Sequence, residues 1–162
     1  MRGGARGRSR PELRAWLAVA ACAGVILIFS GDEFSAGSTS RIFGPLLRWL
    51  FPDLSGPSLL ALHLWVRKTA HLVEYALLGL LAFRALRVSL AISLPRTALL
   101  GLLLVLVIAA TDELRQSLTA SRTGSLVDVG IDLAGGALGV CLIVALHSAA
   151  GVPPPTSEAP RG

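Results

Sequence analysis

The sequence carries little charge for its length. Asp, Glu, Lys and Arg make up only 15% of the 162 residues, whereas 53% are hydrophobic, and the mean hydropathy is +0.68. Soluble domains of this size do not concentrate their apolar residues in several long uninterrupted runs, as this chain does. The scarcity of charge therefore argues against an ordinary soluble domain and indicates a single small integral membrane domain.

Acidic residues and cysteines are scarce as well. The net charge of +5 could suggest a nucleic-acid partner. However, the arginines lie at the ends of apolar runs and in the N-terminal tail, and no module alternates basic with aromatic residues, so we expect no nucleic-acid partner. The two cysteines, Cys22 and Cys141, lie inside apolar runs, where small packing residues are a better interpretation than a disulfide.

Four apolar segments predict an all-α integral membrane bundle of four transmembrane helices. The first segment resembles a signal peptide, but a poor cleavage site follows it, so we interpret it as an uncleaved signal anchor. In the first outer loop, "IFGPLLRWLFP" predicts a short interfacial helix because its aromatic residues suit the headgroup region. The four predicted spans cover about 15–30, 69–86, 97–113 and 127–147.

This pattern divides the chain into three parts. Residues 1–14 form a basic tail, residues 15–147 form the transmembrane domain, and residues 148–162 form a Pro-rich tail that we expect to be disordered. Four spans place both termini on one side of the membrane. The basic N-terminal tail assigns that side to the cytoplasm, so we expect a multi-pass cell-membrane protein with both termini cytoplasmic.

Three acidic residues lie deep in the predicted spans. Glu74 is ten residues from Arg84, or about 15 Å along a helix, and Asp112 is sixteen residues from Arg96, or about 24 Å. Asp132 is likewise expected below the outer surface of a hydrocarbon core about 30 Å thick. A charge at the centre of a span costs about 2.5–3.5 kcal/mol, so such residues face one another or a wet cavity.

The spacing of the polar residues agrees with their depth. Residues three or four apart share a helix face, so each of three helices presents a polar patch at its outer end. We expect these patches to turn inward and form one pocket, in which His71 pairs with Glu74. Simpler interpretations remain open, because His71 could be an ordinary helix-end residue and Asp128 a helix cap. Gly135 and Gly139 predict close helix packing rather than chemistry.

Three blocks of the sequence, "RKTAHLVEYALLGLL", "TDELRQSL" and "SRTGSLVDVGIDLAGGALG", resemble the signature blocks of the VanZ-like family of membrane proteins. Leu118, Ala120 and Ser121 depart from the family's usual residues, but no polar signature residue is lost. The family is named for a protein associated with resistance to the glycopeptide antibiotic teicoplanin. The resemblance implies a bacterial cell-envelope membrane protein and no particular reaction.

The polar patches and the resemblance together predict a binding site that faces outward. Its ligand would be a membrane lipid or a cell-wall precursor, and Lys68, Arg115 and Arg122 would hold phosphate. The two arginines could instead be solvated loop charges. Clusters of acids with a single histidine are more often hydrogen-bond networks than metal sites, so we expect no metal. The sequence identifies no cofactor. The predicted ligand-binding residues are Lys68, His71, Glu74, Tyr75, Asp112, Glu113, Gln116, Arg122, Asp128 and Asp132.

Two other functions remain open from the sequence. The first is an intramembrane hydrolase or transferase that acts on an envelope lipid, with His71, Glu74, Asp112 and Glu113 as catalytic candidates. Its weakness is the lack of a recognised nucleophile. The second is proton-coupled transport through Glu74 and His71, which four short helices could carry only as an oligomer.

Overall fold

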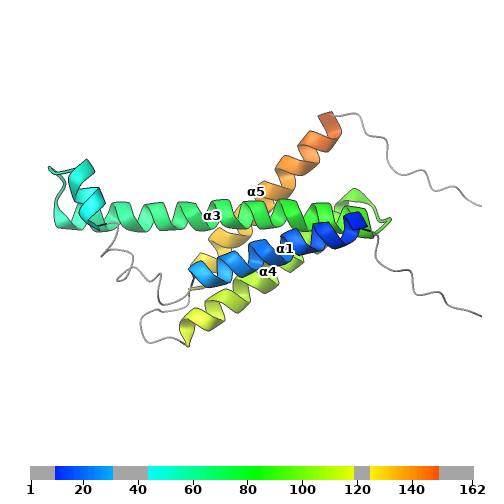
Figure 1. Cartoon of the computed structure of the whole chain (residues 1–162), viewed down its shortest axis with the longest axis horizontal. Coiled ribbons are helices and arrows are strands. Elements are labelled where there is room, and N and C mark those ends of the chain that lie inside the picture. Colours follow the sequence, from blue (N-terminus) through cyan, green and yellow to red (C-terminus); the bar gives the residue numbers. More distant parts are fainter. Residues whose placement is uncertain (1–9, 31–43, 119–124, 150–162) are drawn as a thin grey trace, which may run out of the picture.

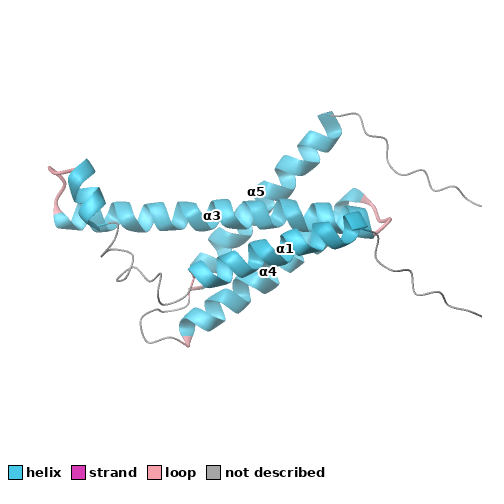
Figure 2. Cartoon of the chain, viewed as in Figure 1, coloured by secondary structure: helices cyan, strands magenta, loops and turns pink. Residues whose placement is uncertain are grey.

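The computed structural model describes residues 10–30, 44–118 and 125–149, and these ranges are helical apart from short connections (Figure 2). The prediction of an all-α protein is confirmed. A short helix covers residues 44–50, within the segment that predicts an interfacial helix, although its place in the membrane interface stays a prediction. The four long helices are α1 (Arg10–Phe29), α3 (Gly56–Ser89), α4 (Leu94–Ser117) and α5 (Leu126–Ala149).

Serine and proline set the starts of two long helices. Ser55 precedes α3, and its side-chain oxygen accepts a hydrogen bond of 3.4 Å from the backbone N–H of Ser58. Proline lies in the first turn of α3 and of α4, where its missing N–H has no intrahelical partner to lose. Local sequence signals therefore account for where both helices begin.

Three of the helices in the described ranges are long and apolar enough to cross a membrane. They are α1, α4 and residues Leu126–Leu146 of α5. By contrast, α3 has 34 residues and a length of about 51 Å, which exceeds the hydrocarbon core. Its charged residues lower its hydropathy, and the predicted span over 69–86 stays a prediction. The three apolar helices indicate a membrane protein.

Helix α3 is the central element of the bundle (Figure 1). It packs against α1, α4 and α5, and α4 also packs against α5. The first part of α3 extends beyond the other helices and carries the short helix of residues 44–50 near its end (Figure 1). The opposite ends of the bundle therefore differ in shape, and the polar residues gather nearer the extended end.

Glycines allow α3 and α5 to cross in close backbone contact. A Cβ atom added to Gly135 would lie 2.5 Å from the carbonyl oxygen of Leu72, and one added to Gly139 would overlap the carbonyl oxygen of Ala76. These distances are shorter than van der Waals contact, so a methyl group at either position forces the helices apart. The prediction that Gly135 and Gly139 serve helix packing is confirmed.

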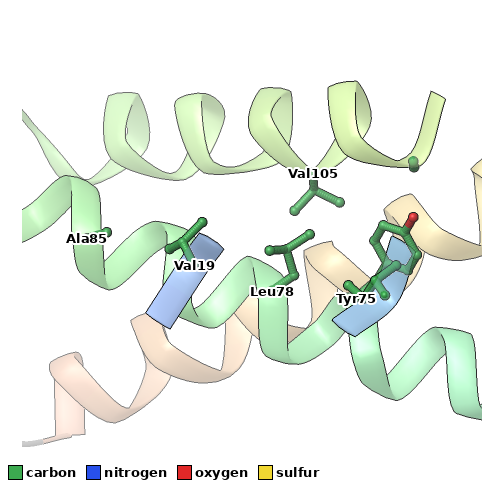
Figure 3. Packing of buried hydrophobic residues seen from close by; sticks show 7 residues of the cluster. Val19, Tyr75, Leu78, Ala85 and Val105 are labelled. Atoms are coloured by element: carbon green, nitrogen blue, oxygen red, sulfur yellow. The ribbon is translucent and has the colours of Figure 1, made fainter. Parts of the chain in front are cut away.

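The main apolar core lies where α1, α3 and α4 meet. Val19, Leu78 and Val105 converge there from these three helices (Figure 3). Tyr75 belongs to the same cluster and is fully buried. Its aromatic ring is therefore part of the core, while its hydroxyl group lies at the boundary with the polar residues described next.

Candidate functional site

The polar residues that the sequence predicts as a site lie on α3, α4 and α5. They lie toward the end of the bundle where α1 and α4 end and α5 begins (Figure 1). Arg122 lies outside the described residues. Apart from Glu113, which makes a separate contact, the structure brings the other polar residues into two groups with different bonding, which we call the closed half and the open half. The closed half consists of Ser30, Asp112, Arg115 and Gln116; the open half consists of Lys68, His71, Glu74, Tyr75, Asp128 and Asp132.

Asp112 is the centre of the closed half and has no exposed surface. Its Oδ2 atom accepts hydrogen bonds from Ser30 Oγ at 2.5 Å and from Gln116 Nε2 at 2.8 Å. Its Oδ1 atom accepts one from Arg115 Nη2 at 3.2 Å. Gln116 Nε2 also lies 2.6 Å from Ser30 Oγ. Both carboxylate oxygens are thus occupied by groups of the protein itself, which is how a buried acid is stabilised.

Arg115 extends the closed half to the end of α1. Its Nη2 atom donates to the carbonyl oxygen of Leu27 at 2.5 Å, and the last carbonyls of a helix lack an intrahelical partner. From the sequence, Arg115 was interpreted as a loop charge or a phosphate ligand. In the structure it joins α1 to α4. Sequence reasoning missed Ser30, because a single serine after an apolar run resembles any helix end.

Glu113 has a structural contact of its own. Its Oε2 atom accepts a hydrogen bond of 2.7 Å from the backbone N–H of Ser125, next to the start of α5. A carboxylate at this position satisfies a backbone donor and suits the positive end of the helix dipole. Glu113 therefore helps to fix where α5 begins relative to α4.

Two ion pairs in the open half join α3 to α5. At the rim, Lys68 Nζ lies 2.5 Å from Asp128 Oδ1, and both side chains are more than 40% exposed. One turn further along each helix, His71 Nδ1 lies 3.5 Å from Asp132 Oδ1, and Asp132 is 1% exposed. The four-residue spacing of the two aspartates on α5 thus matches two basic positions on α3.

The expected pair between His71 and Glu74 does not form. Close packing of α5 against α3 brings Asp132 to His71 instead, and the His71 and Tyr75 rings lie nearly parallel with centroids 6.3 Å apart. Within the described part of the chain, the half-buried carboxylate of Glu74 has no hydrogen-bond or ion-pair partner. The interpretation from helix spacing was wrong here because it considered α3 alone.

Two buried polar atoms in the open half also lack partners within the described ranges. Tyr75 Oη and Asp132 Oδ2 make no hydrogen bond to any residue that the structure describes. An unsatisfied buried polar group costs about 1–3 kcal/mol, so native proteins keep few of them, and each one requires an explanation. Among the described residues, the buried acid of the open half therefore has an oxygen without a partner, whereas both oxygens of Asp112 in the closed half are occupied.

A groove of about 560 Å³ lies beside the open half, along α3 and α5. Its walls are mostly apolar, and Lys68 contributes the charged group among them. Within the described ranges, no three His, Cys, Asp or Glu side chains form a group that could hold a metal ion. The groove is lined by Ala61, Leu64, Trp65, Lys68, Thr69, Leu72 and Ile131.

Comparison with known proteins identifies the family of this chain. The model of the VanZ/LLP1 family matches residues 15–147, which include most of all four long helices. Neither a curated protein nor a solved structure matches the chain. The three blocks of polar signature residues all lie within the matched range, and the chain belongs to the VanZ/LLP1 family.

Proposed function

We propose that this protein binds the headgroup of a cell-envelope lipid, or of a lipid-linked cell-wall component, in the open half of the polar cluster. The observation that carries the proposal is that two buried atoms, Tyr75 Oη and Asp132 Oδ2, have no hydrogen-bond partner among the described residues. A ligand that offers hydrogen-bond donors would satisfy the aspartate, and the tyrosine hydroxyl can donate or accept. Sugar hydroxyls, amides and ammonium groups all supply such donors.

The groove beside the open half supports a lipid as the ligand. Its wall combines apolar side chains with Lys68, which is one turn from His71 on α3. An acyl or isoprenoid chain in the groove would place a phosphate near Lys68 and the remaining headgroup near His71 and Glu74. The ion pair of Lys68 with Asp128 is exposed and thus weak, so a phosphate can compete for Lys68.

The distribution of charge supports a membrane orientation for this site. Five arginines lie on α1, α3 and α4 toward the end opposite the polar cluster, namely Arg10, Arg14, Arg84, Arg87 and Arg96. Positive charge accumulates on the cytoplasmic side of membrane proteins. We infer that α3 is a fourth span, that both termini are cytoplasmic, and that the open half faces the outer leaflet.

A link to glycopeptide resistance follows from the same proposal. If the ligand is a lipid-linked cell-wall component at the outer leaflet, its capture would change the supply of the material that teicoplanin-type antibiotics attack. The open half would be the part of the molecule responsible, because in the closed half both oxygens of the buried acid Asp112 already accept hydrogen bonds from the protein.

The proposal is tested by mass spectrometry of the lipids that co-purify with the protein in a mild detergent. We expect Glu74→Gln to lose a specific envelope lipid that the wild type retains, because the amide replaces an anionic acceptor in the open half. Asp53→Asn is the matched control, since Asp53 is an exposed acid outside the cluster. Identical lipid in all three proteins would refute the proposal.

A second candidate function is an intramembrane hydrolase or transferase that acts on the same lipid. It is favoured by the approach of Asp132 to His71 Nδ1, because an acid that orients an imidazole is a recurring part of general-base catalysis. In that case a hydrolase would break an ester or phosphoester bond of the bound lipid, so that one product gains the hydroxyl group of water and the released group gains its proton. A transferase would pass the same group to the hydroxyl of an acceptor, whose proton the leaving oxygen of the lipid takes up. The same preparation incubated in ¹⁸O-labelled water distinguishes binding from hydrolysis by the label in the lipid products.

A further inference from the structure

The end of the bundle opposite the polar cluster contains a cavity of its own. It has a volume of about 480 Å³ and lies between the start of α1 and the last turns of α3. Three arginines line it: Arg10 and Arg14 are four residues apart on α1, and Arg84 is on α3. Two helices therefore direct like charges into one space.

The walls of this cavity are apolar between the arginines. They include the small residues Ala15 and Ala18 and the larger residues Leu81 and Val88. On one side, a hydrogen bond of 2.9 Å from Trp16 Nε1 to Ser89 Oγ ties α1 to α3. The cavity thus lies between helices that are fixed to each other, and it joins a strongly basic region to an apolar surface.

The three arginines have no acidic partner in the part of the chain that the structure describes. Among the described residues, none of them takes part in an ion pair, and the one acid of α1, Glu12, does not line the cavity. Three guanidinium groups around one space repel one another, so an anion between them is favoured. The partial positive charge at the start of α1 favours an anion, whereas the partial negative charge at the end of α3 disfavours one. The two helix dipoles therefore offset each other, and the attraction of an anion depends on the arginines.

We propose that this cavity binds the phosphate of an acidic phospholipid. The guanidinium groups would hold phosphate oxygens in paired hydrogen bonds, and an acyl chain would follow the alanine and leucine wall. Basic pockets between transmembrane helices are a recurring type of site for acidic headgroups. The proposal is independent of the ligand in the open half, because the two sites lie toward opposite ends of the bundle.

The neighbouring arginines provide the matched control. Arg96 is exposed on the first turn of α4, near the same end of the bundle, but it does not line the cavity. Arg87 is already engaged, because its Nη1 atom donates to the carbonyl oxygen of Ile92 at 2.8 Å. If the charge alone attracted lipid, Arg96→Gln would weaken binding as much as Arg14→Gln or Arg84→Gln.

The test is native mass spectrometry of the full chain in a neutral detergent, titrated with phosphatidylglycerol or phosphatidylcholine. We expect preferential binding of phosphatidylglycerol to the wild type and to Arg96→Gln. We expect the affinity to fall about fivefold in Arg14→Gln and in Arg84→Gln, since each arginine near a membrane surface contributes about 1 kcal/mol. All three positions are exposed, so the variants should melt as the wild type does.

Three results would overturn the proposal. The first is an equal loss in all three variants, which would indicate diffuse charge attraction. The second is equal binding of the two lipids by the wild type. The third is displacement of phosphatidylglycerol by inorganic phosphate at low millimolar concentration, which would indicate a site for a free anion rather than for a lipid.

Discussion

The closed and open halves of the polar cluster each contain a buried acid, but the two acids differ in how many hydrogen-bond partners they have. In the closed half, one buried acid, Asp112, has both oxygens occupied by side chains from α1 and α4. In the open half, another buried acid, Asp132, has one oxygen near His71 and the other without a partner in the described structure. The number of bonds that each acid makes, rather than its burial, therefore separates a structural contact from a candidate binding site.

Removing the acid of the closed half is the strongest way to test this distinction. We expect Asp112→Ala to destabilise the fold by about 3–5 kcal/mol, because it removes the buried carboxylate that accepts hydrogen bonds from Ser30 and Gln116 and pairs with Arg115. Thermal unfolding in detergent measures the loss, and Asp53→Asn is the control. An unchanged melting temperature would contradict the structural role of the closed half.

Removing one hydroxyl from the open half should have the opposite effect. Tyr75→Phe keeps the ring in the core and deletes a buried oxygen that has no hydrogen-bond partner among the described residues. We expect the unfolding free energy to stay the same or rise by about 1 kcal/mol, while the retention of the proposed lipid falls. Unfolding and lipid retention are measured on the same preparation. A clear loss of stability would mean that the hydroxyl already has a partner in the protein.

The smallest effect is expected at the rim. The ion pair between Lys68 and Asp128 is more than 40% exposed on both sides, and exposed pairs contribute about 0.2–1 kcal/mol. A double-mutant cycle with Lys68→Gln and Asp128→Asn should give a coupling energy in this range that decreases as salt is added. A larger, salt-independent coupling would mean that the pair is a structural contact like those of the closed half, and it would contradict this prediction.

The sequence was sufficient to predict an all-helical fold and the region in which the polar side chains gather. Long apolar runs predict helices, and the depth of Glu74, Asp112 and Asp132 along those helices predicts that polar side chains gather near one end. Both inferences depend only on distances along single helices. They hold because an apolar environment restricts where charged side chains can lie.

The partners within the cluster could not be predicted in the same way. Whether His71 meets Glu74 or Asp132 depends on how α5 is rotated against α3, and the glycine contacts with the α3 backbone set that arrangement. Likewise, α3 begins at Gly56 rather than near residue 69, because the polar residues before Ala70 weaken the apolar signal without breaking the helix. The role of Ser30 could not be predicted from the sequence, because its hydrogen bond to Asp112 forms only when the end of α1 lies beside α4.

The glycine contact between α3 and α5 has a mechanical consequence for the rim. Gly136 lies beside Gly79 at the crossing, and Asp128 is eight residues earlier, or about 12 Å along α5. A change of about 10° in the crossing angle would therefore displace Asp128 by about 2 Å, which is enough to separate it from Lys68. Helices change tilt when bilayer thickness changes. In a membrane, the distance between Lys68 and Asp128 would thus depend on the thickness of the surrounding lipid.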